Sequence, residues 1–122
     1  MIHKHLLCRA IVDRSFSIGE ASSTLDQFLR ECVDLVNARI LIEPQVALSD
    51  ANAWTGIVGI STSHIAFHYW PEFRLLQLDL YSCREFSVAQ ITDLIQRFWD
   101  VRHAEFILVD RSGKLDVSVQ TG

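Results

Sequence analysis

The chain has 122 residues, of which 49% are hydrophobic and 21% charged, and its formal net charge at pH 7 is −4. This length and composition predict one globular domain and exclude a disordered chain. The negative charge, without any cluster of Lys and Arg, excludes a nucleic-acid-binding surface, and no apolar run is long enough for a signal peptide or a membrane span. Three cysteines, Cys8, Cys32 and Cys83, are widely spaced and match neither a disulfide framework nor a zinc site. We therefore expect a reduced, cytoplasmic protein with no bound metal.

The first part of the chain is expected to form a strand, a helix and a second strand. Residues 6–12 are rich in β-formers and contain no breaker, which predicts a strand. Apolar residues over 25–36 recur at helical spacing, and Ser22 or Ser23 is a candidate N-cap for this helix. Residues 40–48 predict the second strand, and the proline in its middle indicates a sheet edge or a bend.

Three strands in close succession are expected next. They cover residues 54–61, 63–70 and 74–82. In the last of them Leu76, Leu78 and Leu80 alternate with polar residues, which is typical of a sheet with one buried face.

The clearest helix spans residues 87–102, where Ser87 and Gln90 form a capping box. Two short strands, 105–110 and 115–119, then flank a Ser-Gly pair that predicts a hairpin turn. The resulting order is β-α-β-β-β-β-α-β-β. With two one-sided helices it predicts an α+β fold, a two-layer sandwich in which both helices cover one face of a mostly antiparallel sheet.

The densest group of reactive side chains lies between residues 61 and 83. Residues 61–72 read Ser-Thr-Ser-His-Ile-Ala-Phe-His-Tyr-Trp-Pro-Glu, and Cys83 follows one strand later. The segment resembles the self-cleavage and active-site motif of the pyruvoyl-dependent S-adenosylmethionine decarboxylases of the small prokaryotic type, usually Glu-Ser-His-…-His-Thr-Trp-Pro-Glu. The close resemblance covers residues 55–83, and the remainder of the chain matches in the order of its elements.

This resemblance implies self-cleavage between Thr62 and Ser63. The Ser63 hydroxyl would attack the preceding carbonyl carbon, and β-elimination would leave a pyruvoyl group on the new N-terminus. That self-made cofactor would form a Schiff base with the amino group of the substrate and act as an electron sink during decarboxylation. His68 would assist processing with support from Thr55, and Cys83 would return a proton to the substrate.

The resemblance also implies S-adenosylmethionine as the substrate, and a product that donates aminopropyl groups in polyamine (spermidine) synthesis. Trp70 would stack on the adenine and Glu72 would contact the ribose. Trp54 is a further candidate for the purine site. Because members of the family assemble as dimers, a homodimer is implied as well.

Several positions depart from the family pattern. Thr62 replaces a Glu, and Tyr69 replaces a Thr. Arg84 replaces a Gly, so a left-handed backbone there would be strained, or the loop would follow another path. Residues 48–54 lack the pattern Phe-x-Pro-x-Gly and carry Ser49 where an adenine-stacking phenylalanine is expected.

The spacing of Ser63 and His68 adds a geometric condition. The two positions differ by an odd number, so a regular strand directs their side chains to opposite faces of the sheet. A bulge, or release of the new terminus after cleavage, is then needed to bring them together.

Other interpretations remain open. The departures favour an unprocessed, inactive homologue that acts as a partner, regulatory or binding protein. The altered loop favours a pyruvoyl decarboxylase of a smaller amino acid, arginine or ornithine. Taken singly, a turn serine, a surface histidine or a lone cysteine is more often structural, which is compatible with an unrelated two-layer domain.

Overall fold

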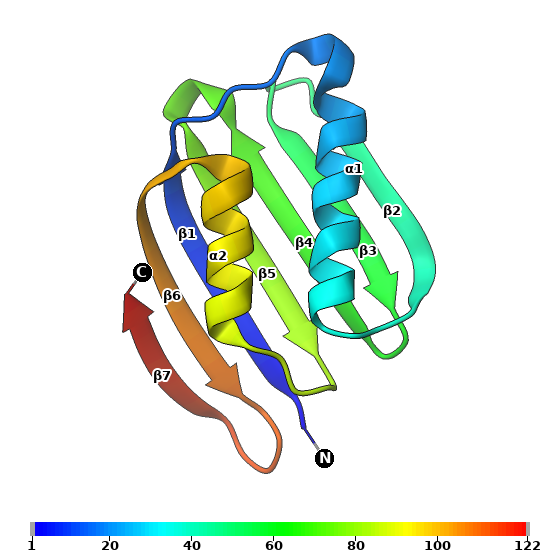
Figure 1. The fold of residues 1–122 in the computed structure, drawn as a ribbon, viewed down its shortest axis with the longest axis vertical. Helices are drawn as coiled ribbons and strands as arrows, with labels where there is room; N and C mark the ends of the chain where they lie inside the picture. The colour runs from blue at the N-terminus through cyan, green and yellow to red at the C-terminus, as the bar shows by residue number, and fades with distance from the viewer. Residues whose placement is uncertain (1, 122) are drawn as a thin grey trace.

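Seven antiparallel strands form one sheet in the computed structural model, which describes residues 2–121. The elements are β1 (Lys4–Val12), α1 (Ile18–Leu35), β2 (Ile40–Leu48), β3 (Trp54–Ile60), β4 (Ser63–Trp70), a short 3-10 helix (Pro71–Phe73), β5 (Leu75–Ser82), α2 (Val88–Trp99), β6 (Val101–Asp110) and β7 (Asp116–Thr121). The strand order across the sheet is β2-β3-β4-β5-β1-β6-β7. Both helices cover the same face (Figure 1). The predicted α+β sandwich and its element order are confirmed.

The first helix begins earlier than the sequence predicted. It starts at Ile18, and Ser17, with extended backbone, is its N-cap. The candidate caps Ser22 and Ser23 are wrong, since both lie inside α1 on its exposed side. The polar first turns of α1 carry little of the apolar periodicity on which the prediction rested.

The second helix begins as predicted but ends sooner. Ser87 caps it, and its hydroxyl accepts a hydrogen bond from the Gln90 N–H. Asp100 takes a left-handed φ of 54° and ends the helix after Trp99. The predicted end at residue 102 is therefore wrong, because β6 already starts at residue 101.

Strand β2 lies at an edge of the sheet, as the proline predicted. Its pairing with β3 shifts register between Ile42 and Gln45, on either side of Pro44. An edge position tolerates the missing N–H of proline, so Pro44 costs the sheet no internal hydrogen bond.

The core is organised around the indole of Trp99, which is fully buried. Its ring centroid lies 5.0–5.9 Å from the centroids of five aromatic rings: Phe16, Phe28, Phe67, Tyr69 and Phe98. These rings come from the segment before α1, from α1, from β4 and from α2. The cluster therefore fixes both helices on β4, the strand that carries the sequence motif.

The other face of the sheet has no helix on it (Figure 1). It exposes apolar side chains, among them Leu7, Ile57 and Ile107, which are 36%, 46% and 39% exposed. We refer to it below as the open face. Within residues 2–121, neither helix is long and apolar enough to cross a membrane.

Gly56 provides a test of how tightly β3 packs on β4. A Cβ atom added there would lie 2.2 Å from Cε2 of Phe67, its cross-strand partner. We expect Gly56→Ala to lower the free energy of unfolding by about 1–3 kcal/mol, because the buried Phe67 ring would have to move. The measurement is urea denaturation, in a Ser63→Ala background that lacks the hydroxyl required for the predicted self-cleavage.

Gly19→Ala is the matched control for this prediction. Gly19 lies in the first turn of α1, and an added Cβ would meet no atom within 4 Å. Alanine is the better helix former, so we expect no loss of stability. Equal stability of the two variants would contradict the packing argument.

Candidate functional site

The candidate cleavage site is the two-residue turn that joins β3 to β4. Ile60 and Ser63 pair across this hairpin, so Ser61 and Thr62 form the turn. Ser61 has a φ of 52°, in the left-handed region that favours glycine. The backbone is therefore strained directly before the Thr62–Ser63 peptide, where self-cleavage would require strain.

The structure brings Thr62, Ser63 and Cys83 together. Ser63, the first residue of β4, is 8% exposed, and its Oγ accepts a hydrogen bond of 2.9 Å from the backbone N–H of Cys83. The hydroxyl of Thr62 donates to Cys83 Sγ at 3.2 Å. Because β4 and β5 are neighbouring strands, the start of one and the end of the other meet at one end of the sheet.

The loop after β5 avoids the strain considered for Arg84. Arg84 is not among the residues with positive φ. Instead the Ser82 hydroxyl donates to the Arg84 carbonyl at 2.8 Å and accepts from the Arg84 N–H at 3.0 Å. The loop thus follows another path, fixed by Ser82, and it keeps Cys83 beside Ser63.

Cys83 differs from the other two thiols in its acidity. Hydrogen bonding with Ser63, and then with the Thr62 hydroxyl, lowers the pKa of Cys83 from its ordinary value. Burial raises the pKa of Cys8 to about 12 and raises that of Cys32 as well. Since the thiolate is the reactive form, Cys83 is the thiol available for chemistry in the folded chain.

A small pocket of about 80 Å³ opens beside these residues. Ser63 and Cys83 line it together with Ile60 and two arginines, Arg39 and Arg84. It is large enough for a small polar group and too small for a nucleoside.

Thr55 and His68 form a second group on the open face. They are cross-strand partners, and Thr55 Oγ1 lies 2.9 Å from His68 Nδ1. The Trp70 ring lies on the same face, with its centroid 5.8 Å from that of His68. His68 also lines a hollow of about 520 Å³, to which Asp79 and Glu105 contribute.

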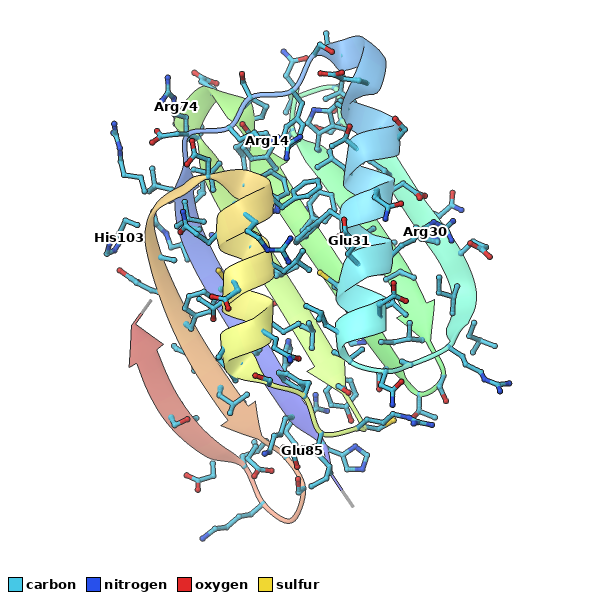
Figure 2. The ribbon with its side chains drawn as sticks, in the orientation of Figure 1. Arg14, Arg30, Glu31, Arg74, Glu85 and His103 are labelled. Carbon is cyan, nitrogen blue, oxygen red and sulfur yellow. The ribbon has the colours of Figure 1, made fainter. Side chains whose placement is uncertain are left out.

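The two groups do not meet within one chain. Strand β4 pairs with β3 and β5 without a register shift, so no bulge turns Ser63 and His68 to one face. Ser63 is buried on the helix side, whereas His68 is exposed on the open face, as their spacing predicted. Five residues of extended strand also separate them by about 17 Å. Figure 2 shows the two ends: Arg74, which follows the end of β4, lies at one, and Glu85, just past Cys83, at the other.

The predicted substrate-binding residues gather at the His68 end. Trp54 is 8% exposed and faces the helix side, whereas Trp70 is on the open face and Glu72 is exposed in the 3-10 helix. Ser49 folds its own loop, since its hydroxyl accepts hydrogen bonds from the N–H groups of Ala51 and Ala53. The roles of these residues in purine binding stay predictions.

Tyr69 lies in the core rather than beside the site. Its ring centroid is 5.0 Å from that of Trp99, and its hydroxyl donates to the carbonyl of Arg14 at 3.2 Å. Arg14 itself lies at the same end of the molecule as Arg74 (Figure 2). The extra bulk at position 69 is thus absorbed by aromatic packing.

The open face also carries a cluster formed by His5, His64, Asp79 and Tyr81, which the sequence did not indicate. His5 Nε2 lies 3.6 Å from Asp79 Oδ1, and the ring centroids of His64 and Tyr81 are 5.6 Å apart. Burial lowers the pKa of His5, and the nearby Asp79 carboxylate opposes that shift.

The sequence also did not indicate the left-handed backbone of Ser61 or the hydrogen bond from Thr62 to Cys83, because both depend on the exact geometry of the turn. Among residues 2–121, no group of three or more His, Cys, Asp and Glu side chains could hold a metal ion.

Comparison with known proteins agrees with the sequence motif. Residues 12–112 match the sequence model of the S-adenosylmethionine decarboxylase family. The S-adenosylmethionine decarboxylase proenzyme of Saccharolobus solfataricus is 35% identical over 65 residues, which cover 48% of this chain and 46% of that protein. The proenzyme of Archaeoglobus fulgidus is 48% identical over 33 residues, covering 27% of this chain and 30% of that protein. The chain thus spans about half the length, or less, of these curated relatives.

The fold also matches a solved structure. The adenosylmethionine decarboxylase from Aquifex aeolicus superimposes with a TM-score of 0.69, covers 88% of each chain and is 20% identical in sequence. At this identity the match establishes a common fold.

Ser61 provides a test of the strain in the turn. We expect Ser61→Gly to raise the free energy of unfolding by about 0.5–1 kcal/mol, since relief of a left-handed residue outweighs the added freedom of glycine. The measurement is urea denaturation in the Ser63→Ala background. Asn52→Gly is the control: Asn52 also has a left-handed φ of 58°, but asparagine tolerates it. A Ser61→Gly chain no more stable than its parent would contradict the strain.

Proposed function

Because the chain belongs to the S-adenosylmethionine decarboxylase family, we propose that it is a pyruvoyl-dependent decarboxylase that makes its cofactor by cleavage between Thr62 and Ser63. The observation that carries the proposal is the strained turn at Ser61, which leads directly into a serine hydroxyl held against the Cys83 N–H. We propose S-adenosylmethionine as the substrate, in line with the names of the relatives. Its decarboxylated product would be the aminopropyl donor of spermidine synthesis, made in the cytoplasm.

Self-processing is a rearrangement of the chain's own atoms. Ser63 Oγ adds to the Thr62 carbonyl carbon and the C–N bond breaks, which gives an ester and a free amino group. A base then removes the Ser63 Cα proton and the Cβ–O bond breaks, so Thr62 leaves as a carboxylate that keeps the serine oxygen. Water finally replaces the nitrogen of residue 63, which departs as ammonia, and a pyruvoyl group remains.

The residues around position 63 fit such a group. A pyruvoyl carbonyl supplies an electron sink for the carbanion that loss of carbon dioxide leaves. The Cys83 backbone N–H bonds Ser63 Oγ in the intact chain, and it would become available to an oxygen of the pyruvoyl group once the serine oxygen has left with Thr62. The Cys83 thiol, beside the same residue, is placed to return a proton to the substrate carbon.

The predicted base, His68, does not reach Ser63 within one chain. Ser63 Oγ bonds the Cys83 N–H, and the Thr55–His68 pair lies at the far end of the sheet on the other face. We infer that two copies of the chain pair through their open faces and that His68 of one copy serves Ser63 of the other. The exposed apolar side chains of that face, Leu7 and Ile107 among them, give such a pairing area to bury.

A two-fold symmetric dimer would bring His68 of each copy to Ser63 of the other. A two-fold axis that lies between the sheets and runs across the strands reverses the strand direction of the partner. The His68 end of one sheet then covers the Ser63 end of the other, at both sites at once. Thr62, whose carbonyl carbon would be attacked, is an exposed turn residue at that end of the sheet.

Intact mass under denaturing conditions tests the processing. We expect the purified chain to give two fragments, residues 1–62 and residues 63–122 with a blocked N-terminus, and Ser63→Ala to give one full-length mass. The cleaved protein should release carbon dioxide from S-adenosylmethionine, and Ser63→Ala should release none. A wild-type chain that stays full-length on long incubation would overturn the proposal in favour of a non-enzymatic partner.

Mixed dimers test the shared site. We expect His68→Ala alone to cleave at least 100-fold more slowly, because a general base contributes about 10²–10⁴-fold. When it is co-expressed with Ser63→Ala, the His68→Ala chain should be cleaved, since its partner carries an intact His68. Co-expression with a chain bearing both substitutions is the control and should not restore cleavage. A His68→Ala chain that stays intact in the mixed dimer would show that His68 acts within its own chain.

A further inference from the structure

The Thr62 hydroxyl makes a contact that the cleavage chemistry does not need. Only the carbonyl carbon of residue 62 takes part in processing, yet the side chain donates a hydrogen bond of 3.2 Å to Cys83 Sγ. Thr62 is exposed, so its hydroxyl could equally be solvated. In the structure it is directed at the thiol that lies beside residue 63, the position of the proposed pyruvoyl group.

Cleavage changes the surroundings of this thiol. In the intact chain Cys83 has two hydroxyl neighbours, Ser63 and Thr62, and both lower the pKa of the thiol. Processing moves the Ser63 oxygen onto Thr62, so residue 63 loses its hydroxyl and Thr62 gains a carboxylate. A negative charge close to a thiol disfavours the thiolate, so the effect on acidity is reversed.

The new carboxylate cannot move far from Cys83. Thr62 would become a chain terminus only two residues beyond Ile60, which pairs within the sheet. Two residues reach at most about 7 Å. Cys83 is held from the other side, because Ser82 fixes the loop that follows β5.

We propose that Thr62 is a positioning residue for Cys83: its hydroxyl orients the sulfur in the intact chain, and the carboxylate that cleavage creates at Thr62 keeps the thiol protonated afterwards. The inference rests on the proposed function. A thiolate has no proton to donate. Cleavage would therefore create the pyruvoyl group and, at the same time, keep Cys83 in the protonated form that donates a proton. The residue that replaces the usual Glu thus acquires a role of its own.

Alkylation of Cys83 by iodoacetamide, followed by mass spectrometry against pH, tests the two halves separately. Cys8 and Cys32 are buried and should not react in the folded protein. In the Ser63→Ala background we expect Thr62→Val to slow alkylation of Cys83 at pH 7 by about two- to fivefold, the loss of one hydrogen bond to the thiolate. Thr62→Ser, which keeps the hydroxyl, should react at nearly the parent rate. Equal rates for the Val and Ser variants would overturn the role of the hydroxyl.

The second half compares cleaved wild-type protein with Ser63→Ala. Residue 63 lacks a hydroxyl in both, and the pyruvoyl group of the cleaved protein is uncharged, so the new carboxylate at Thr62 is the charge by which the two differ. We expect the midpoint of the alkylation profile to lie at higher pH in the cleaved protein, and an equal or lower midpoint would overturn the carboxylate role. A wild-type chain that never cleaves would overturn the proposed function and the carboxylate role together. The Thr62→Val result, measured on intact chains, would still decide the role of the hydroxyl.

Discussion

The two-residue period of strand β4 is the constraint on which the rest of the structure depends. Phe67 and Tyr69 are held in the aromatic cluster around Trp99, so the helix side takes every odd position of the strand. Ser63 must then face the helices, and His68 must face the open side. Only a bulge between Ser63 and His68 would turn them to one face, and β4 pairs with β3 and β5 without a register shift.

The same core holds the strained hairpin closed. Strands β3 and β4 pair along their full length, and the Phe67 ring packs directly on Gly56. A left-handed non-glycine residue such as Ser61 costs of order 1–3 kcal/mol and persists only when its surroundings fix it. Cleavage between Thr62 and Ser63 would relieve that strain and leave the pairs from Gly59–His64 onward in place. Stability and reactivity are thereby assigned to different parts of one hairpin.

The open face carries functional side chains at both of its ends, and within one chain these two groups do not contact each other. It carries the Thr55–His68 pair at one end and, at the other, the cluster of His5 with Asp79 and of His64 with Tyr81. Apolar side chains lie between them, including Leu7 and Ile57. A face that is apolar in the middle and titratable at both ends suits a partner that presents the same surface in the reverse direction. The proposed dimer uses His68 and the apolar side chains of this face.

The sequence by itself determined that the chain forms a mostly antiparallel sheet and that both helices cover one face of it. Alternation in the strands and helical spacing in 25–36 and 87–99 are local patterns, and the motif from Thr55 to Cys83 named the family and the candidate residues. The opposite faces of Ser63 and His68 also followed from spacing alone. The ends of the helices were harder to predict from the sequence, because Ser17 begins α1 and Asp100 ends α2 through their backbone angles, which many residue types can adopt. Only the tertiary structure decided three features: the left-handed φ of Ser61, the hydrogen bonds between the Ser82 hydroxyl and the Arg84 backbone, and the hydrogen bond from Thr62 to Cys83. These depend on how the ends of β3, β4 and β5 meet, and that contact is set by packing across the whole sheet rather than by any short stretch of sequence.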